Sequence, residues 1–136
     1  MIVPYWLALL TEACRHPEQT DEGLRLVAEA LAVADHNAER WYEAELYRLK
    51  GELLLARSPH QHTDAESCFQ QALNIAGAQH AKSWELRAAM SLARLWQGQG
   101  KHVEARQLLA PIYDWFTEGF DTADLREAKG LLEALS

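Results

Sequence analysis

The sequence predicts an all-α fold in which antiparallel helical hairpins stack into an α-α superhelix. Three observations lead to this fold class. Apolar residues recur at helical spacing in seven segments, no window alternates polar and apolar residues as a strand does, and related hairpins recur every 40–42 residues. The chain of 136 residues fits a single domain over 1–136, and its 49% hydrophobic content with 24% charge is ordinary for a globular protein.

Seven helical segments separate on apolar periodicity and on the turn residues between them. Their expected ranges are 4–15, 20–34, 37–57, 63–76, 83–97, 102–117 and 122–135. Pro17 follows the first segment and Pro59 follows the third, where a proline cannot continue a helix. Thr20 and Asp21 open the second segment with side chains that suit a helix start.

The fourth helix begins with the strongest local signal in the chain. Thr63 and Glu66 have the spacing of a capping box, in which the Thr63 hydroxyl accepts a hydrogen bond from the Glu66 N–H and Glu66 reaches back. We therefore expect this helix to start at Thr63 and to end at Gly77.

Glycines and one proline mark the second half of the chain. Gly98 and Gly100 are expected to close the fifth helix, and Gly119 the sixth. Pro111 lies inside the sixth helix and removes one backbone donor, so the helix is expected to bend there. Asp121 is the expected cap of the last helix.

Small residues recur at matching positions along the chain. Gly23, Ala65 and Ala105 follow each other at intervals of 42 and 40 residues, and Gly51 and Ala93 are 42 residues apart. A small residue lets two helices of a hairpin approach closely. The expected hairpins are 4–35, 37–77 and 81–117, followed by a capping helix over 121–135.

The pattern of small and large residues in each hairpin resembles the tetratricopeptide (TPR) repeat family. It is carried by Gly51, Leu54, Ala65, Phe69 and Ala72 in the second hairpin, by Leu92, Ala93, Trp96, Ala105, Leu109 and Ile112 in the third, and more weakly by Leu10, Thr11, Cys14, Gly23, Val27 and Ala30 in the first. The repeat is longer than the ~34 residues of the standard unit, so this TPR-like stack is expected to have longer helices.

Two stretches near the end of the chain, 93–111 and 113–122, resemble the C-terminal regions of large bacterial multidomain signalling proteins. These are nucleotide cyclases with a predicted ATPase module and ATP-dependent transcription activators. The resemblance implies a sensor or adaptor region of a cytoplasmic signalling protein. Any cyclase or ATPase activity would then belong to other domains.

No residue pattern in the chain predicts catalysis, a metal site or a cofactor. His60 and His62 have a metal-like spacing but lack a cysteine or carboxylate at partner spacing. The glycines of 98–101 lack the spacing and the Ser/Thr of a phosphate-binding loop. Cys14 and Cys68 lie far apart in apolar helical patterns, which suits buried thiols in a reducing cytoplasm. We therefore expect a protein that is not an enzyme.

The expected partner is a protein or a peptide. A net charge of −7 disfavours direct nucleic-acid binding, because like charges repel a phosphate backbone. No stretch approaches the ~20 apolar residues of a membrane span. In a helical solenoid the first helices of the hairpins line a concave surface. That concave face should hold Tyr5, Ala8, Glu12, Arg15, Glu45, Arg48, Glu52, Leu55, Arg87, Met90, Arg94 and Gln97.

Several alternatives stay open at this stage. Glu45, Arg48 and Glu52 could form only an intrahelical charge ladder. A closed apolar pocket would favour a small-molecule effector sensor over a protein-binding scaffold. A third alternative is a self-association domain.

The two ends of the stack are expected to differ. The first helix is apolar on nearly all sides, with Tyr5, Trp6 and Leu9 among its residues, so further repeats or a second copy in a homodimer should cover it. The last helix should point Leu125, Ala128, Leu132 and Leu135 inward and Arg126, Glu127, Lys129 and Glu133 outward. Of the five tryptophans, Trp6, Trp84 and Trp96 are expected in the core.

Overall fold

The computed structural model describes residues 16–36, 42–119 and 122–136. All regular secondary structure in these ranges is helical, and no strand occurs in them, which confirms the all-α class. The α-helices are α2 (Thr20–His36), α3 (Glu43–Arg57), α4 (His62–Ala78), α5 (Lys82–Gly98), α6 (His102–Asp114) and α7 (Ala123–Ala134), and the 3-10 helices are η1 (Pro17–Gln19) and η2 (Pro59–Gln61). The expected helix 4–15 lies outside the described residues.

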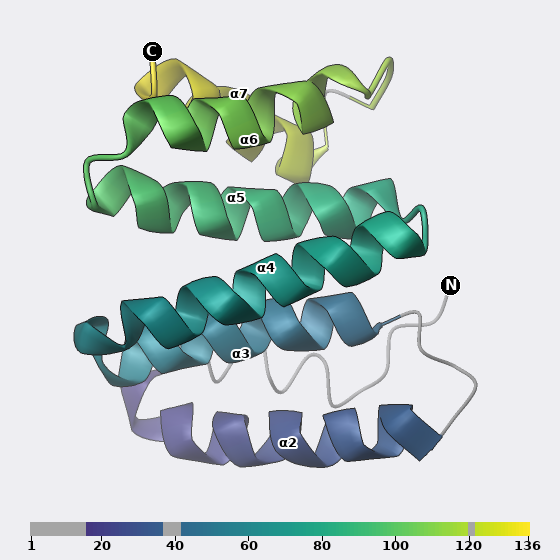
Figure 1. Cartoon of the computed structure of the whole chain (residues 1–136), viewed down its shortest axis with the longest axis vertical. Helices are drawn as coiled ribbons and strands as arrows, with labels where there is room; N and C mark the ends of the chain where they lie inside the picture. Colours follow the sequence, from purple (N-terminus) through teal and green to yellow (C-terminus); the bar gives the residue numbers. More distant parts are fainter. Residues whose placement is uncertain (1–15, 37–41, 120–121) are drawn as a thin grey trace.

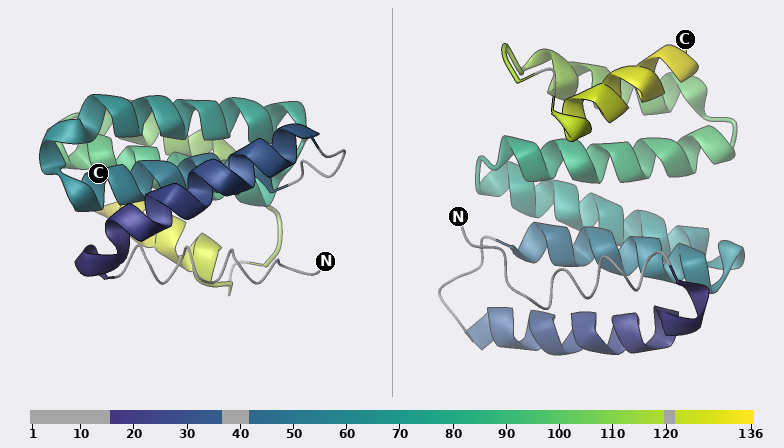
Figure 2. Two further views of the ribbon diagram at one scale, coloured as in Figure 1. Left: turned by 90° about the horizontal axis from the view of Figure 1, so that it is seen from below. Right: turned by 180° about the vertical axis from the view of Figure 1, so that it is seen from behind.

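The helices follow one another along the long axis of the molecule and run antiparallel from α2 to α6 (Figure 1). Each helix packs against the next in the chain. In addition α3 packs against α5, and α5 packs against α7 (Figure 2). This alternate packing brings residues of α3, α5 and α7 together although they lie far apart in the sequence.

The start of α4 differs from the predicted capping box. The chain passes from Ser58, whose Oγ accepts a hydrogen bond from the His60 N–H at 3.3 Å, through η2 directly into α4 at His62. No side chain caps α4, and Thr63 already lies inside the helix. The capping-box prediction was wrong because Glu66 has another partner: its Oε1 accepts from the Trp96 indole Nε1 at 2.8 Å.

The turn from α4 to α5 is built around His80 and not around Gly77. The helix continues past Gly77 to Ala78, and His80 adopts a left-handed conformation with φ of 55°. The Ala81 N–H donates to the Ala76 carbonyl at 2.9 Å and the His80 N–H to the Gly77 carbonyl at 3.2 Å. These two bonds make a Schellman motif, which normally has glycine at the left-handed position.

The turn from α5 to α6 repeats that motif with a glycine. Gly100 has φ of 80°, the Lys101 N–H donates to the Trp96 carbonyl at 2.8 Å, and the Gly100 N–H donates to the Gln97 carbonyl at 3.1 Å. Gly98 lies inside α5. Of the two glycines that were expected to close the helix, Gly100 is therefore the one that the backbone conformation requires.

The last two helices are shorter than expected. Pro111 lies inside α6, as predicted, but the helix ends at Asp114, before the expected residue 117. Thr122 stands at the N-cap position of α7, and the predicted cap, Asp121, lies outside the described residues. The bend at Pro111 stays a prediction.

The predicted small-residue positions lie at helix contacts. Gly51 of α3 is buried against Phe69 of α4, and a Cβ atom on Gly51 would lie 2.5 Å from Phe69 Cε1. Ala93 at the matching position of α5 is fully buried in a cluster with Ala105 and Leu109 of α6. Gly51 and Ala93 therefore both lie where two helices meet, as the sequence predicts.

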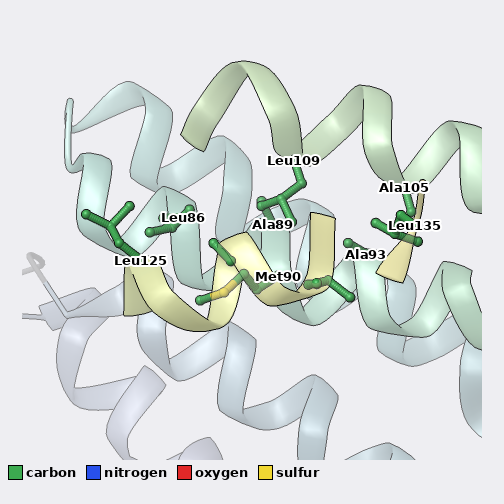
Figure 3. Close-up of a cluster of buried hydrophobic side chains, with 10 residues drawn as sticks. Leu86, Ala89, Met90, Ala93, Ala105, Leu109, Leu125 and Leu135 are labelled. Carbon is green, nitrogen blue, oxygen red and sulfur yellow. The ribbon is translucent and has the colours of Figure 1, made fainter. Parts of the chain in front are cut away.

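The largest core cluster joins α5, α6 and α7 (Figure 3). Leu125, Ala128 and Leu135 of α7 are buried in it, and Leu132 packs partly buried against it. The residues expected to face outward, Arg126, Glu127, Lys129 and Glu133, are exposed. The predicted polar outer face of the last helix is confirmed.

The tryptophans divide differently from the prediction. Trp96 is half-buried and packs against two core clusters. Trp84 is also half-buried, with the Arg87 guanidinium 5.8 Å from its ring centre. Trp115 is exposed, and Trp6 and Trp41 lie outside the described residues.

Candidate functional site

The predicted concave face is described only on α3 and α5. Tyr5, Ala8, Glu12 and Arg15 lie outside the described residues. The remaining residues of the prediction separate into a buried ionic cluster, one core residue, an open groove and Gln97, which belongs to none of these.

The ionic cluster is centred on Glu45 of α3, which is only 2% exposed. One carboxylate oxygen, Oε1, accepts from Arg48 Nε at 2.7 Å and also bonds the Arg48 Nη2. The other, Oε2, accepts from Arg87 Nη1 of α5 at 3.3 Å, and Arg48 Nη1 donates to Ser91 Oγ at 3.3 Å. A buried carboxylate with these partners is satisfied within the protein.

Glu45 therefore joins two helices and is not part of an open surface. The alternative of an intrahelical ladder holds for Glu45 and Arg48, which are three residues apart on α3. Arg87 adds a contact between helices. Glu45 and Arg87 are in contact, and the packing of α3 against α5 closes that part of the predicted face.

Two ion pairs continue from α5 to α7. Arg87 Nε lies 3.7 Å from Asp124 Oδ2, and Arg94 Nη2 lies 3.2 Å from Glu127 Oε2. The helical pattern of the last helix predicts only a solvent-facing position for Glu127. Its pairing with Arg94 depends on how α7 docks, which periodicity within one helix does not specify.

Met90 is 2% exposed and belongs to the core between α5, α6 and α7 (Figure 3). Its inclusion in the partner-binding face was wrong. Met90 lies on the face of α5 that packs against α7. The periodicity of α5 shows that the helix is amphipathic, but it does not show whether an apolar face packs against another helix or binds a partner.

An open groove of about 780 Å³ lies beside the end of α3, the start of α4 and the end of α5. We call it the α3–α5 groove. It is lined by Glu52, Leu55, His62, Thr63, Glu66, Ser91, Arg94, Leu95, Gly98, Gln99 and Lys101. Three predicted concave-face residues, Glu52, Leu55 and Arg94, line this groove, whereas Gln97 does not and is half-buried on α5.

The groove lining includes side chains of both charges and two half-buried leucines, Leu55 and Leu95. Glu52 and Lys101 form no ion pair with any described residue, so both charged groups can interact with a ligand in the groove. Arg94 is already paired with Glu127 of α7. A groove of this kind can hold an apolar side chain and orient charged groups on either side of it.

The residues that α4 contributes to the groove were missed. The sequence pattern predicts that Thr63 and Glu66 form a helix cap and that His62 lies in a loop. They reach the groove because the start of α4 packs against the end of α5 through the bond from Trp96 to Glu66. No local sequence pattern could predict this contact, because Trp96 and Glu66 lie on different helices and are 30 residues apart in the sequence.

The chemistry available in the described ranges is limited. No three His, Cys, Asp or Glu side chains in these ranges gather closely enough to hold a metal ion. Burial raises the pKa of the half-buried Cys68 thiol, which keeps it in the neutral form at pH 7 and lowers its nucleophilicity. Among the described helices, none has the length and apolar character needed to cross a membrane.

Comparison with known proteins finds no relative of this chain. No family model, no curated protein and no solved structure matches this sequence. The resemblance to TPR repeats thus depends on the residues of the hairpins themselves.

Proposed function

We propose that the chain is a protein-interaction module, a TPR-like stack of helical hairpins that binds a peptide segment of a partner in the α3–α5 groove. The observation that supports this proposal is the mixed lining of an open groove, which includes two leucines and the unpaired Glu52 and Lys101. Small-molecule sites are predominantly apolar, with few polar groups. An extended or helical peptide fits a groove with alternating charge better, because its side chains can supply both signs of charge.

The proposal keeps the regulatory scaffold role that the sequence resemblance implies. Helical-repeat proteins use the extended surface formed by successive repeats for recognition. The groove draws on two hairpins, since Glu52 and Leu55 come from α3 and Arg94 and Leu95 come from α5. Loss of the packing between these hairpins would therefore remove the groove. Self-association through the first helix concerns residues outside the described ranges.

A double charge reversal tests the proposal. A random dodecapeptide library displayed on phage is selected on the immobilised chain, and the affinity of selected peptides is measured by fluorescence polarisation. E52K/K101E keeps the net charge and inverts the two unpaired groove charges. We expect this variant to weaken binding about tenfold or more, since each charged contact contributes up to ~1 kcal/mol at an exposed site.

The matched control is E104K/R106E, which inverts two exposed charges on α6 and also keeps the net charge. We expect its affinity to stay within about twofold of wild type, because neither residue lines the groove. Failure to select any peptide, or equal losses in both double variants, would contradict peptide binding in the α3–α5 groove.

A further inference from the structure

A second cavity, of about 470 Å³, lies where the start of α5, the end of α6 and the start of α7 meet. We call it the Trp115 cavity. It is lined by Ser83, Leu86, Trp115, Phe116, Thr117, Glu118, Gly119, Thr122, Asp124 and Leu125. None of these residues lines the α3–α5 groove, so the two sites can be tested separately. Its volume is in the range of small-molecule sites.

Two aromatic rings meet at this cavity. Trp115 is 58% exposed, and its ring centre lies 5.2 Å from that of Phe116 with the ring planes at 86°. Leu86 and Leu125, both buried, add aliphatic surface to the lining. The cavity lining therefore includes two aromatic rings at right angles and two aliphatic side chains, which favour contact with a weakly hydrated group.

The Trp115 ring already attracts a cation within the protein. The Lys82 ammonium nitrogen lies 5.4 Å from the ring centre, within the distance of a cation–π interaction. Lys82 also pairs with Glu85, their charged atoms being 3.6 Å apart. Lys82 does not line the cavity, whereas Trp115 does, so the cavity leaves aromatic surface for a second cation.

Two carboxylates complete the cavity. Glu118 is exposed and forms no ion pair with any residue that the structure describes. Asp124 lies 3.7 Å from Arg87, which neutralises only part of the negative charge at the cavity. The electrostatic surroundings therefore favour a ligand with a single positive charge over a neutral or anionic one.

We propose that the Trp115 cavity binds a small organic cation of the quaternary ammonium class. A quaternary ammonium has no N–H group to satisfy and is weakly hydrated, so it gains from aromatic faces and aliphatic groups without losing hydrogen bonds to water. A primary ammonium is strongly hydrated through its three N–H donors, so it gains less from aromatic and aliphatic groups than a quaternary ammonium does. Glu118 would supply the counter-charge at the cavity rim.

The test uses choline chloride and its neutral isostere 3,3-dimethyl-1-butanol, titrated separately into the full chain by calorimetry. The two probes have the same shape, and they differ in charge. We expect saturable binding of choline, and binding of the neutral alcohol weaker by about tenfold, because the cation–π interaction distinguishes them. Absence of saturable choline binding up to about 10 mM, or equal affinities for the two probes, would overturn the proposal.

Three variants separate binding from folding. Trp115→Leu keeps an apolar side chain but removes the ring, and it should weaken choline binding by about tenfold. Glu118→Gln removes the counter-charge, and it should weaken choline binding by about threefold. Glu104→Gln, an exposed change on α6 outside the cavity, is the control and should change nothing. If both cavity variants bound choline as the wild type does, the proposal would be wrong.

Lys82→Gln should strengthen choline binding, whereas the two cavity variants should weaken it. Removing the ammonium from beside Trp115 removes a like charge and a competitor for the ring, so choline affinity should rise by about twofold to threefold. A loss of affinity in this variant would contradict the placement of the ligand against Trp115. A separate experiment measures binding of the full chain to phosphatidylcholine vesicles. Binding to the vesicles without binding of free choline would overturn the proposal of a small-molecule site.

Discussion

At the scale of single residues, two turns of the same type differ in one position. His80 and Gly100 occupy equivalent left-handed positions in the Schellman motifs that end α4 and α5. A side chain in this conformation costs about 1 kcal/mol, because its Cβ approaches the backbone carbonyl. The fold keeps His80 there because the hydrogen bonds of the motif and the packing of α4 on α5 fix the turn.

His80→Gly should therefore stabilise the protein. The substitution removes the left-handed strain at a position with φ of 55°, and we expect a gain of about 0.5–1 kcal/mol in the free energy of unfolding. Gly100→Ala introduces the same strain at φ of 80° and should cost about 1 kcal/mol. Urea denaturation followed by circular dichroism measures both, and changes of the same sign in the two variants would contradict the account.

At the scale of helices, the contact between α3 and α4 depends on the absence of a side chain at Gly51. Gly51→Ala would place a Cβ atom 2.5 Å from Phe69 Cε1, and Phe69 is fully buried and cannot move into solvent. We expect a loss of about 1–3 kcal/mol from overpacking. The melting temperature and the urea midpoint measure this loss.

A compensating change distinguishes overpacking from a loss of glycine flexibility. Phe69→Leu removes the ring atoms that clash, so Gly51→Ala should cost less in the Phe69→Leu background by about 1 kcal/mol. Additive losses in the double variant would show that the two residues are not coupled, and the hairpin contact would then need another explanation.

The ion pairs between alternate helices should differ in strength. Glu45→Ala leaves Arg48 and Arg87 without the buried carboxylate that joins α3 to α5, and we expect a loss of about 3 kcal/mol. Glu127→Ala removes only the exposed partner of Arg94 and should cost about 0.5 kcal/mol. Equal losses in chemical denaturation would contradict the burial assigned to Glu45.

The sequence predicted what depends on local pattern. The helices after residue 20, the small positions Gly51 and Ala93, and the outer face of the last helix all follow from periodicity, and the structure agrees with them. Two bounds differ, because α3 begins at Glu43 and not at residue 37, and α6 ends at Asp114 and not at residue 117. It did not predict that Glu66 would bond Trp96 or that Met90 would be buried. Both depend on how α5 packs against its neighbours, and one helical stripe does not show which neighbour covers it.

At the scale of the whole molecule, the stack of helices creates sites that no single hairpin contains. The α3–α5 groove takes residues from α3, α4 and α5, and the Trp115 cavity takes residues from α5, from α7 and from the segment between α6 and α7. α5 contributes to both, and it lies between α3 and α4 on one side and α6 and α7 on the other (Figure 1). Ligands at the two sites would therefore contact opposite ends of the same helix.

The most direct test of peptide binding in the α3–α5 groove is NMR mapping of the full chain with and without a selected peptide. The account predicts that chemical-shift changes concentrate on the methyl groups of Leu55 and Leu95 and on the backbone amides of 98–101, while the amides of exposed Glu104 and Arg106 on α6 stay unchanged. Changes that concentrated on α6 or α7 and spared Leu55 and Leu95 would contradict it.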